Sequence, residues 1–288
     1  MGVTTLPMPH VAGVEHRYAT VDGVRLHYAE AGEGEPLVLL HGWPQHWWAW
    51  RELLGPLSER YRVIAPDIRG IGWSEAPHDD YRFVRFADDL FGLLDELGIE
   101  RTRLVGHDWG TGAGYMACLA RPERIERFVA SGGPHIWAAD GAPPRLYARP
   151  WHLYVNASPL GDVATKRLGV PARCLKEWRH RGSFTPEEIE IYTSPLRRPG
   201  SARATRLRYR TFLTSELPAF VRRHGEMRLR VRTLHLNGEN DPLTIGTPGS
   251  WRRYADDMRY ETVADCGHFL AEEQPQEVLD RLTEFLGG

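Results

Sequence analysis

Short apolar runs alternate along the chain with longer segments of mixed character. The first two runs flank Asp22 and Gly23, a dipeptide typical of a hairpin turn. Short apolar runs between turn residues predict buried strands, because a strand covered on both faces needs no polar side. Together with the two strands of this hairpin, eight runs are predicted as strands, at residues 16–21, 24–30, 36–42, 61–67, 101–107, 124–133, 231–238 and 260–265.

The segments between these runs space their apolar residues as a helix does. In residues 83–99, Phe86, Leu90 and Leu94 fall on one side, which predicts an amphipathic helix packed on a sheet. Similar segments predict helices at 48–59, 110–122 and 277–286. Strands that alternate with helices predict an α/β protein with a parallel, doubly wound sheet.

This alternation is interrupted once, between residues 134 and 220. The interruption is rich in proline, arginine and aromatic residues, and none of its segments is typical of a strand. We therefore predict a core formed by residues 1–133 and 221–288, with a helical insertion at 134–220. An insertion so late in a parallel sheet is expected to form a cap over the carboxyl ends of the strands.

Composition narrows the kind of protein. Hydrophobic residues make up 42% and charged residues 26%, as in an ordinary globular protein. A formal net charge of −2 favours neither nucleic acid nor an anionic membrane as partner. The chain has three widely spaced cysteines, no signal-peptide pattern at its N-terminus and no apolar run long enough to cross a bilayer. We expect a soluble cytoplasmic protein, monomeric or homodimeric, without metal or cofactor.

The main candidate for chemistry lies at Gly106-His107-Asp108-Trp109-Gly110. This segment follows a predicted buried strand and precedes a predicted helix. Two glycines four residues apart suit a sharp strand-to-helix turn that exposes the residue at its tip. The pattern is that of a nucleophile elbow with Asp108 in the place of serine.

Three other motifs follow predicted strands at the same edge of the sheet. Asp241 lies in NGENDP, after the seventh run, and His268 lies in DCGHF, after the eighth. An acid and then a histidine after the nucleophile is the order that a hydrolytic triad on such a sheet requires. Trp43 follows the third run, where the backbone of such a site supplies one of its two oxyanion-binding amides.

Together these segments resemble a known family. HGWP at 41–44, DIRGIGWSEAP at 67–77, VGHDWG at 105–110, GENDP at 238–242 and DCGHF at 265–269 resemble the epoxide hydrolases of the α/β-hydrolase superfamily. They also resemble haloalkane and fluoroacetate dehalogenases, which share the aspartate nucleophile. The resemblance covers residues 14–287 and implies an α/β-hydrolase fold: a mostly parallel eight-stranded sheet flanked by helices, with an inserted helical cap.

The resemblance also implies a mechanism that suits the residues. A carboxylate is ionised near neutral pH, so Asp108 needs no base before it attacks a saturated carbon. The attack yields an alkyl-enzyme ester, which a water activated by His268 and Asp241 hydrolyses. The backbone amides of Trp43 and Trp109 would bind the oxyanion of that second step. The expected partners are a small-molecule epoxide and water.

Opening an epoxide requires proton donors in the cap. Tyr209, in RYRTF, resembles the second donor tyrosine of the family. The segment Trp151-His152-Leu153-Tyr154 resembles the stretch that carries the first donor, with His152 in the tyrosine's place and Tyr154 as the alternative. An apolar or aromatic epoxide is expected from the residues predicted to contact substrate, which are Trp43, Trp109, Tyr154 and Phe269.

Two alternatives of different kinds remain open. A haloalkane dehalogenase would direct N–H donors at the departing halide. The indole of Trp109 could supply one N–H donor. The second donor is commonly an asparagine directly after the His-Gly of the oxyanion strand, but this chain has Trp43 there. Trp151 or Trp178 would have to be the second donor. A fluoroacetate dehalogenase places arginines just after the nucleophile, and this chain has none there. The other alternative is an inactive ligand-binding protein of the same fold, which the retained Asp108, Asp241 and His268 disfavour.

Overall fold

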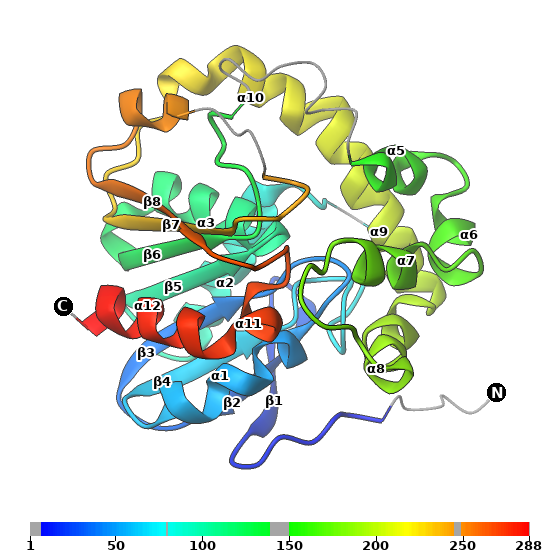
Figure 1. Cartoon of the computed structure of the whole chain (residues 1–288), viewed down its shortest axis with the longest axis horizontal. Coiled ribbons are helices and arrows are strands. Elements are labelled where there is room, and N and C mark those ends of the chain that lie inside the picture. Colours follow the sequence, from blue (N-terminus) through cyan, green and yellow to red (C-terminus); the bar gives the residue numbers. More distant parts are fainter. Residues whose placement is uncertain (1–6, 79, 139–149, 245–248, 288) are drawn as a thin grey trace.

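The computed structural model describes residues 7–78, 80–138, 150–244 and 249–287. Its centre is an eight-stranded sheet with the strand order β1-β2-β4-β3-β5-β6-β7-β8 (Figure 1). Pairing is antiparallel between β1 and β2 and between β2 and β4, and parallel in the rest of the sheet. These features confirm the predicted α/β class and the mostly parallel eight-stranded sheet.

Each predicted run overlaps an observed strand. The strands are β1 (Glu15–Val21), β2 (Val24–Ala31), β3 (Glu35–Leu40), β4 (Tyr61–Pro66), β5 (Thr102–His107), β6 (Ile125–Ser131), β7 (Thr233–Gly238) and β8 (Met258–Val263). Strands β3, β4, β6 and β8 end one or two residues earlier than predicted. The loops at the carboxyl edge carry Trp43, Asp108, Asp241 and His268.

Helices cover both faces of the sheet (Figure 1). One face packs against α1 (Arg51–Ser58) and α12 (Pro275–Gly287), and the other against α2 (Phe83–Glu96) and α3 (Trp109–Ala120). Alternate residues of a strand belong to different layers: Leu37 and Leu39 pack with the first pair, Val38 and Leu40 with the second. Burial on both faces explains why the parallel strands appear in the sequence as continuous apolar runs.

Within its described residues, the segment between β6 and β7 consists of helices joined by loops. We call these elements the inserted helices: α5 (Trp151–Ala157), α6 (Gly161–Lys166), α7 (Val170–Glu177), α8 (Pro186–Leu196), α9 (Pro199–Thr211), the π-helical turn η3 (Phe212–Glu216) and α10 (Leu217–Arg223). They form a layer beside the sheet (Figure 1). Helix α10 crosses residue 220, where the core was predicted to resume, and part of the predicted cap lies outside the described residues at 139–149.

The remaining described elements are short: η1 (Trp47–Trp50), η2 (Pro122–Arg124), η4 (His224–Glu226), η5 (Gly249–Arg253) and α11 (Leu270–Glu273). Helix α11 directly follows His268 and was not predicted, because a single turn is too short to show helical spacing. Within the described ranges, no helix is both long and apolar enough to traverse a bilayer.

Candidate active site

Asp108 stands at the turn between β5 and α3. Its backbone has φ 51° and ψ −111°, a conformation that non-glycine residues rarely adopt. Close packing surrounds the turn, since a Cβ at Gly106 would lie 2.5 Å from the carbonyl oxygen of Gly110. The structure therefore places Asp108 at a tight strand-to-helix elbow, with its side chain projecting from the carboxyl edge of the sheet.

The carboxylate of Asp108 receives backbone hydrogen bonds. The Trp43 N–H donates to Oδ1 at 2.8 Å, from the loop after β3. Burial raises the pKa of Asp108 to about 6, while His268 and the amides of Trp109 and Trp43 act in the opposite direction. The group is thus ionised at neutral pH, but its charge is far less stabilised than in water, as suits a nucleophile.

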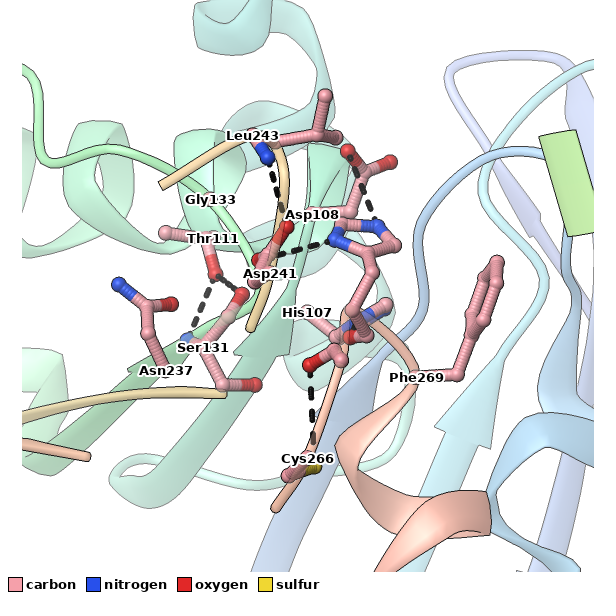
Figure 2. A network of polar contacts seen from close by, with 12 residues as sticks. His107, Asp108, Thr111, Ser131, Gly133, Asn237, Asp241, Leu243, Cys266 and Phe269 are labelled. Atoms are coloured by element: carbon pink, nitrogen blue, oxygen red, sulfur yellow. Dashed lines mark hydrogen bonds and ion pairs between the residues drawn. The ribbon is translucent and has the colours of Figure 1, made fainter. Parts of the chain in front are cut away.

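Asp108 and Asp241 lie near each other (Figure 2), and His268 lies between their carboxylates. Its Nδ1 is 3.2 Å from Oδ2 of Asp241, and its Nε2 is 3.9 Å from Oδ2 of Asp108. The other Asp241 oxygen accepts the Leu243 N–H at 2.8 Å, which fixes the carboxylate on its loop after β7. Both His268 and Asp241 are fully buried. Asp241 and His268 are 27 residues apart in the sequence. The adjacent strands β7 and β8 bring them together at the same edge of the sheet.

The charges around His268 favour its protonated form. Asp241 and Asp108 raise its pKa above the usual value, against the opposing effect of burial. The neighbouring His107 has its pKa lowered to about 3 by burial and by His268, so it is neutral. Its Nε2 lies 2.8 Å from the His268 carbonyl oxygen, to which it donates. This contact gives His107 a structural role in holding the loop that carries His268.

Two predicted proton donors come from the inserted helices. Tyr209 on α9 is buried, with its ring edge-on to Trp109 at 5.0 Å and to Trp43 at 5.3 Å between centroids. His152 on α5 is also buried, and its ring lies parallel to that of Trp43, with centroids 6.1 Å apart. The Tyr209 and His152 centroids are 5.6 Å apart. The structure thus brings both rings together beside the elbow.

A cavity of about 190 Å³ opens beside Asp108. Apolar side chains form most of its wall, among them Phe83, Trp109, Ile136, Phe212, Phe220 and Leu243. An apolar cavity of about 150 Å³ accommodates a benzene ring. Sequence reasoning missed most of these residues, because they come from α2, the inserted helices and separate loops, and each is typical of ordinary core packing.

Only some of the residues that were predicted to contact substrate line the cavity. Trp109, Tyr154 and His152 line the cavity, although Tyr154 is 49% exposed. Phe269 does not line it; its ring packs against His268, Phe184 and Trp178. Figure 2 shows Phe269 apart from Asp108 and Asp241. Its predicted contact with substrate is therefore not supported, because the residue after His268 turns away from Asp108.

Trp43 does not line the cavity itself. Its backbone amide reaches Asp108, and its indole lies between the rings of His152, Tyr209 and Trp178. The indole of Trp43 therefore packs against both predicted proton donors, His152 and Tyr209. Trp178 was considered only as a halide ligand, yet it also packs edge-on against His268 with 5.4 Å between centroids.

Comparison with known proteins places the chain in a family. Residues 35–275 match the alpha/beta hydrolase fold family. Epoxide hydrolase 2 of Siraitia grosvenorii is 43% identical over 315 residues, covering 95% of this chain and 98% of the relative. The fluoroacetate dehalogenase of Burkholderia sp is 28% identical over 291 residues, covering 95% and 94%.

A solved structure agrees with these relatives. The structure of epoxide hydrolase CorEH without ligand matches with a TM-score of 0.85 at 30% identity, covering 95% of this chain and 99% of that one. The match includes the inserted helices as well as the sheet, since so little of either chain is left out. The chain therefore belongs to the α/β-hydrolase superfamily, and within it to the epoxide hydrolase family.

Proposed function

We propose that this enzyme opens an apolar or aromatic epoxide to a vicinal diol through a covalent ester on Asp108. The observation that carries the proposal is the position of the Asp108 carboxylate, held by the Trp43 amide and facing His268 at 3.9 Å. The similarity of this chain to proteins named epoxide hydrolases supports an epoxide as the substrate. The inserted helices act as the cap, because they supply Tyr209 and His152.

In the first step, Oδ2 of Asp108 attacks one carbon of the epoxide ring. Oδ1 is held by the Trp43 amide, so Oδ2 is the oxygen free to react. The C–O bond breaks, and its electron pair moves to the epoxide oxygen, which takes a proton from Tyr209 or His152. Burial lowers the pKa of His152 to about 3, so it acts as a neutral N–H donor.

In the second step, His268 removes a proton from water, which attacks the Cγ of Asp108. The oxyanion forms on Oδ1, where the amides of Trp43 and Trp109 bind it; one such donor is typically worth ~3 kcal/mol. The oxyanion then collapses with cleavage of the Cγ–Oδ2 bond, and the leaving alkoxide takes the proton from His268 to give the diol. Asp108 contributes to the raised pKa of His268. Alkylation removes that negative charge, so ester formation itself favours the neutral imidazole that the second step needs.

The wall of the cavity supports an apolar substrate. The cavity beside Asp108 is lined by aromatic side chains that include Phe83, Phe212 and Phe220. Its volume of about 190 Å³ suits a single aromatic ring. A charged epoxide would lose its hydration there without a counter-ion. Styrene oxide combines one aromatic ring with a terminal epoxide and is the test substrate of choice.

The test is a single turnover of excess enzyme with styrene oxide in ¹⁸O-labelled water. The ester route transfers an unlabelled Asp108 oxygen to the diol and leaves ¹⁸O in the Asp108 carboxylate, because water attacks Cγ. Direct attack of water on the epoxide would instead put ¹⁸O in the first diol formed. The variant Asp108→Ala should form no diol by either route, whereas diol formation by this variant would exclude Asp108 as nucleophile.

One observation keeps dehalogenation as the second candidate. The same nucleophile can displace a halide, and one relative of this chain is named a fluoroacetate dehalogenase. Against it, Thr111 and Gly110 follow the nucleophile, where that activity would need cationic groups for a carboxylate. Halide release from a bromoalkane, in the absence of diol formation from styrene oxide, would favour this candidate.

A further inference from the structure

A single carboxylate organises the loop that carries His268. Glu273, on α11, accepts the backbone N–H groups of Gly267 at 2.9 Å and Phe269 at 3.0 Å, which flank His268 on both sides. Glu273 is buried, so these charge-assisted hydrogen bonds are protected from water. The position of the His268 backbone is thus tied to one side chain.

The same carboxylate also holds the inserted helices. Between α7 and α8, the N–H groups of His180 and Arg181 each donate to Oε2 of Glu273 at 2.8 Å. The His268 N–H, for its part, donates to the Trp178 carbonyl oxygen at 2.9 Å. The two segments are therefore joined around Glu273, with His268 between them.

Space at this junction is minimal. A Cβ on Gly267 would lie 2.6 Å from both the His180 nitrogen and the Trp178 oxygen, and 2.9 Å from Oε1 of Glu273. Only glycine permits the segment after α7 to approach the His268 loop so closely. The two hydrogen bonds from His180 and Arg181 to Glu273 depend on that approach.

The charge of Glu273 reaches the imidazole. Together with Asp241 and Asp108, it is one of the charges that raise the pKa of His268. The adjacent Glu272 differs, although it is equally buried. Its carboxylate pairs with Arg51 and accepts the Tyr192 hydroxyl at 2.6 Å, on the side away from His268. Neighbouring acids on one helical turn thus have separate partners.

We propose that Glu273 is a positioning residue for His268: it fixes the imidazole from the backbone side and strengthens it as a base in ester hydrolysis. The inference rests on the proposed function, in which His268 acts only in the second step. It follows that loss of Glu273 affects hydrolysis of the ester and spares its formation.

The variant Glu273→Gln tests this directly. The glutamine oxygen can occupy the place of Oε2 and accept three N–H groups, but its NH2 then faces the Phe269 N–H, a donor against a donor. In single-turnover reactions with styrene oxide, we expect ester formation within about twofold of wild type and hydrolysis slower by roughly 10- to 100-fold. The acid limb of hydrolysis should move to lower pH. Unchanged hydrolysis and an unchanged limb would overturn the proposal.

Two further variants separate the contributions. Glu272→Gln is the matched control and should leave the ratio of the two steps as in wild type; equal slowing there would show a general effect of α11 and contradict a specific role of Glu273. Glu273→Asp keeps the charge on a shorter side chain, so hydrolysis should slow while its acid limb stays near that of wild type. Wild-type hydrolysis in this variant contradicts the positional part, even if Glu273→Gln does not fold.

A substrate-free measurement distinguishes failure of the inference from failure of the proposed function. The titration of His268, followed by NMR and assigned by its loss in His268→Gln, should shift to lower pH in Glu273→Gln. This shift is expected whether or not the enzyme opens epoxides. A His268 titration equal to that of wild type would overturn the electrostatic part even in an active epoxide hydrolase.

Discussion

Nε2 of His268 lies 3.9 Å from Oδ2 of Asp108, too far for a hydrogen bond, whereas its Nδ1 is 3.2 Å from Asp241. A serine nucleophile would need its base in direct contact, because its proton must leave before attack. An aspartate has no proton to give at neutral pH. The spacing therefore suits a base that acts on water after the nucleophile has reacted.

Tyr209→Phe should slow formation of the ester on the order of 10²-fold and leave its hydrolysis unchanged. The variant keeps the ring contacts with Trp109 and Trp43 but removes the hydroxyl that protonates the epoxide oxygen. Rapid-quench single-turnover kinetics with styrene oxide separate the two steps. If the defect lies in hydrolysis, the role given to Tyr209 is wrong.

His152→Phe should likewise slow ester formation, whereas Tyr154→Phe should have little effect. His152 is buried beside Tyr209, and phenylalanine preserves its stacking on Trp43 while removing the N–H donor. Tyr154 lines the same cavity but is 49% exposed, so an alkoxide there would be solvated by water. The same kinetic assay decides between them, and the reverse pattern would identify Tyr154 as the first donor.

Ester formation should fall as pH drops below about 6. Burial raises the pKa of Asp108 to about 6, so the protonated, unreactive form accumulates below that value, and the rate should be level above it. His268 lowers this pKa, so in His268→Gln the midpoint should lie at higher pH than in wild type. The test is the pH dependence of single-turnover alkylation. A midpoint that is lower in the variant would contradict this assignment of charges.

Glu216 should make stability depend on pH. It ends the π-helical turn before α10, and its Oε1 accepts the Phe83 N–H of α2 at 2.6 Å. Burial raises its pKa from 4.5 to about 7, so the folded state favours the protonated form. The stabilisation is complete below pH 4.5 and is lost as pH rises to about 7, on the order of 3 kcal/mol.

Glu216→Gln should remove this contribution. Urea unfolding at about pH 5 and pH 8 should show a smaller loss of stability with rising pH in the variant than in wild type. Glu284→Gln, an exposed site on α12, is the control and should behave as wild type. The same pH dependence in all three proteins would exclude Glu216 as its source.

Local patterns were sufficient for most of the fold. The inner strands, β2 to β7, appear as short apolar runs because they are largely buried, whereas the edge strands β1 and β8 are partly exposed. The elbow at Asp108 is visible because all its requirements lie within five residues. Asp241 and His268 could be predicted as well, since each follows a strand that ends at the same edge of the sheet. Tyr209 was found through the family resemblance and not through periodicity.

The remainder of the site depends on contacts between distant segments. Phe83 and Phe220 line the cavity from two helices 137 positions apart, yet each reads as an ordinary core residue. Phe269 was expected to contact substrate because it follows His268, but the backbone there turns it toward Phe184. Glu273 gave no signal, because two of the four N–H groups that it accepts come from residues 180–181, about 90 positions away in the chain.

Mass spectrometry of intact His268→Gln tests the central claim most directly. The variant keeps Asp108, Trp43 and Tyr209 but lacks the base that hydrolyses the ester. After incubation with styrene oxide, we predict a mass gain equal to the whole epoxide, located on the peptide that contains Asp108. A gain of only the alkyl group from a bromoalkane, with none from the epoxide, would transfer the assignment to dehalogenation. Unmodified protein after both incubations, in a folded variant, would contradict a covalent route through Asp108.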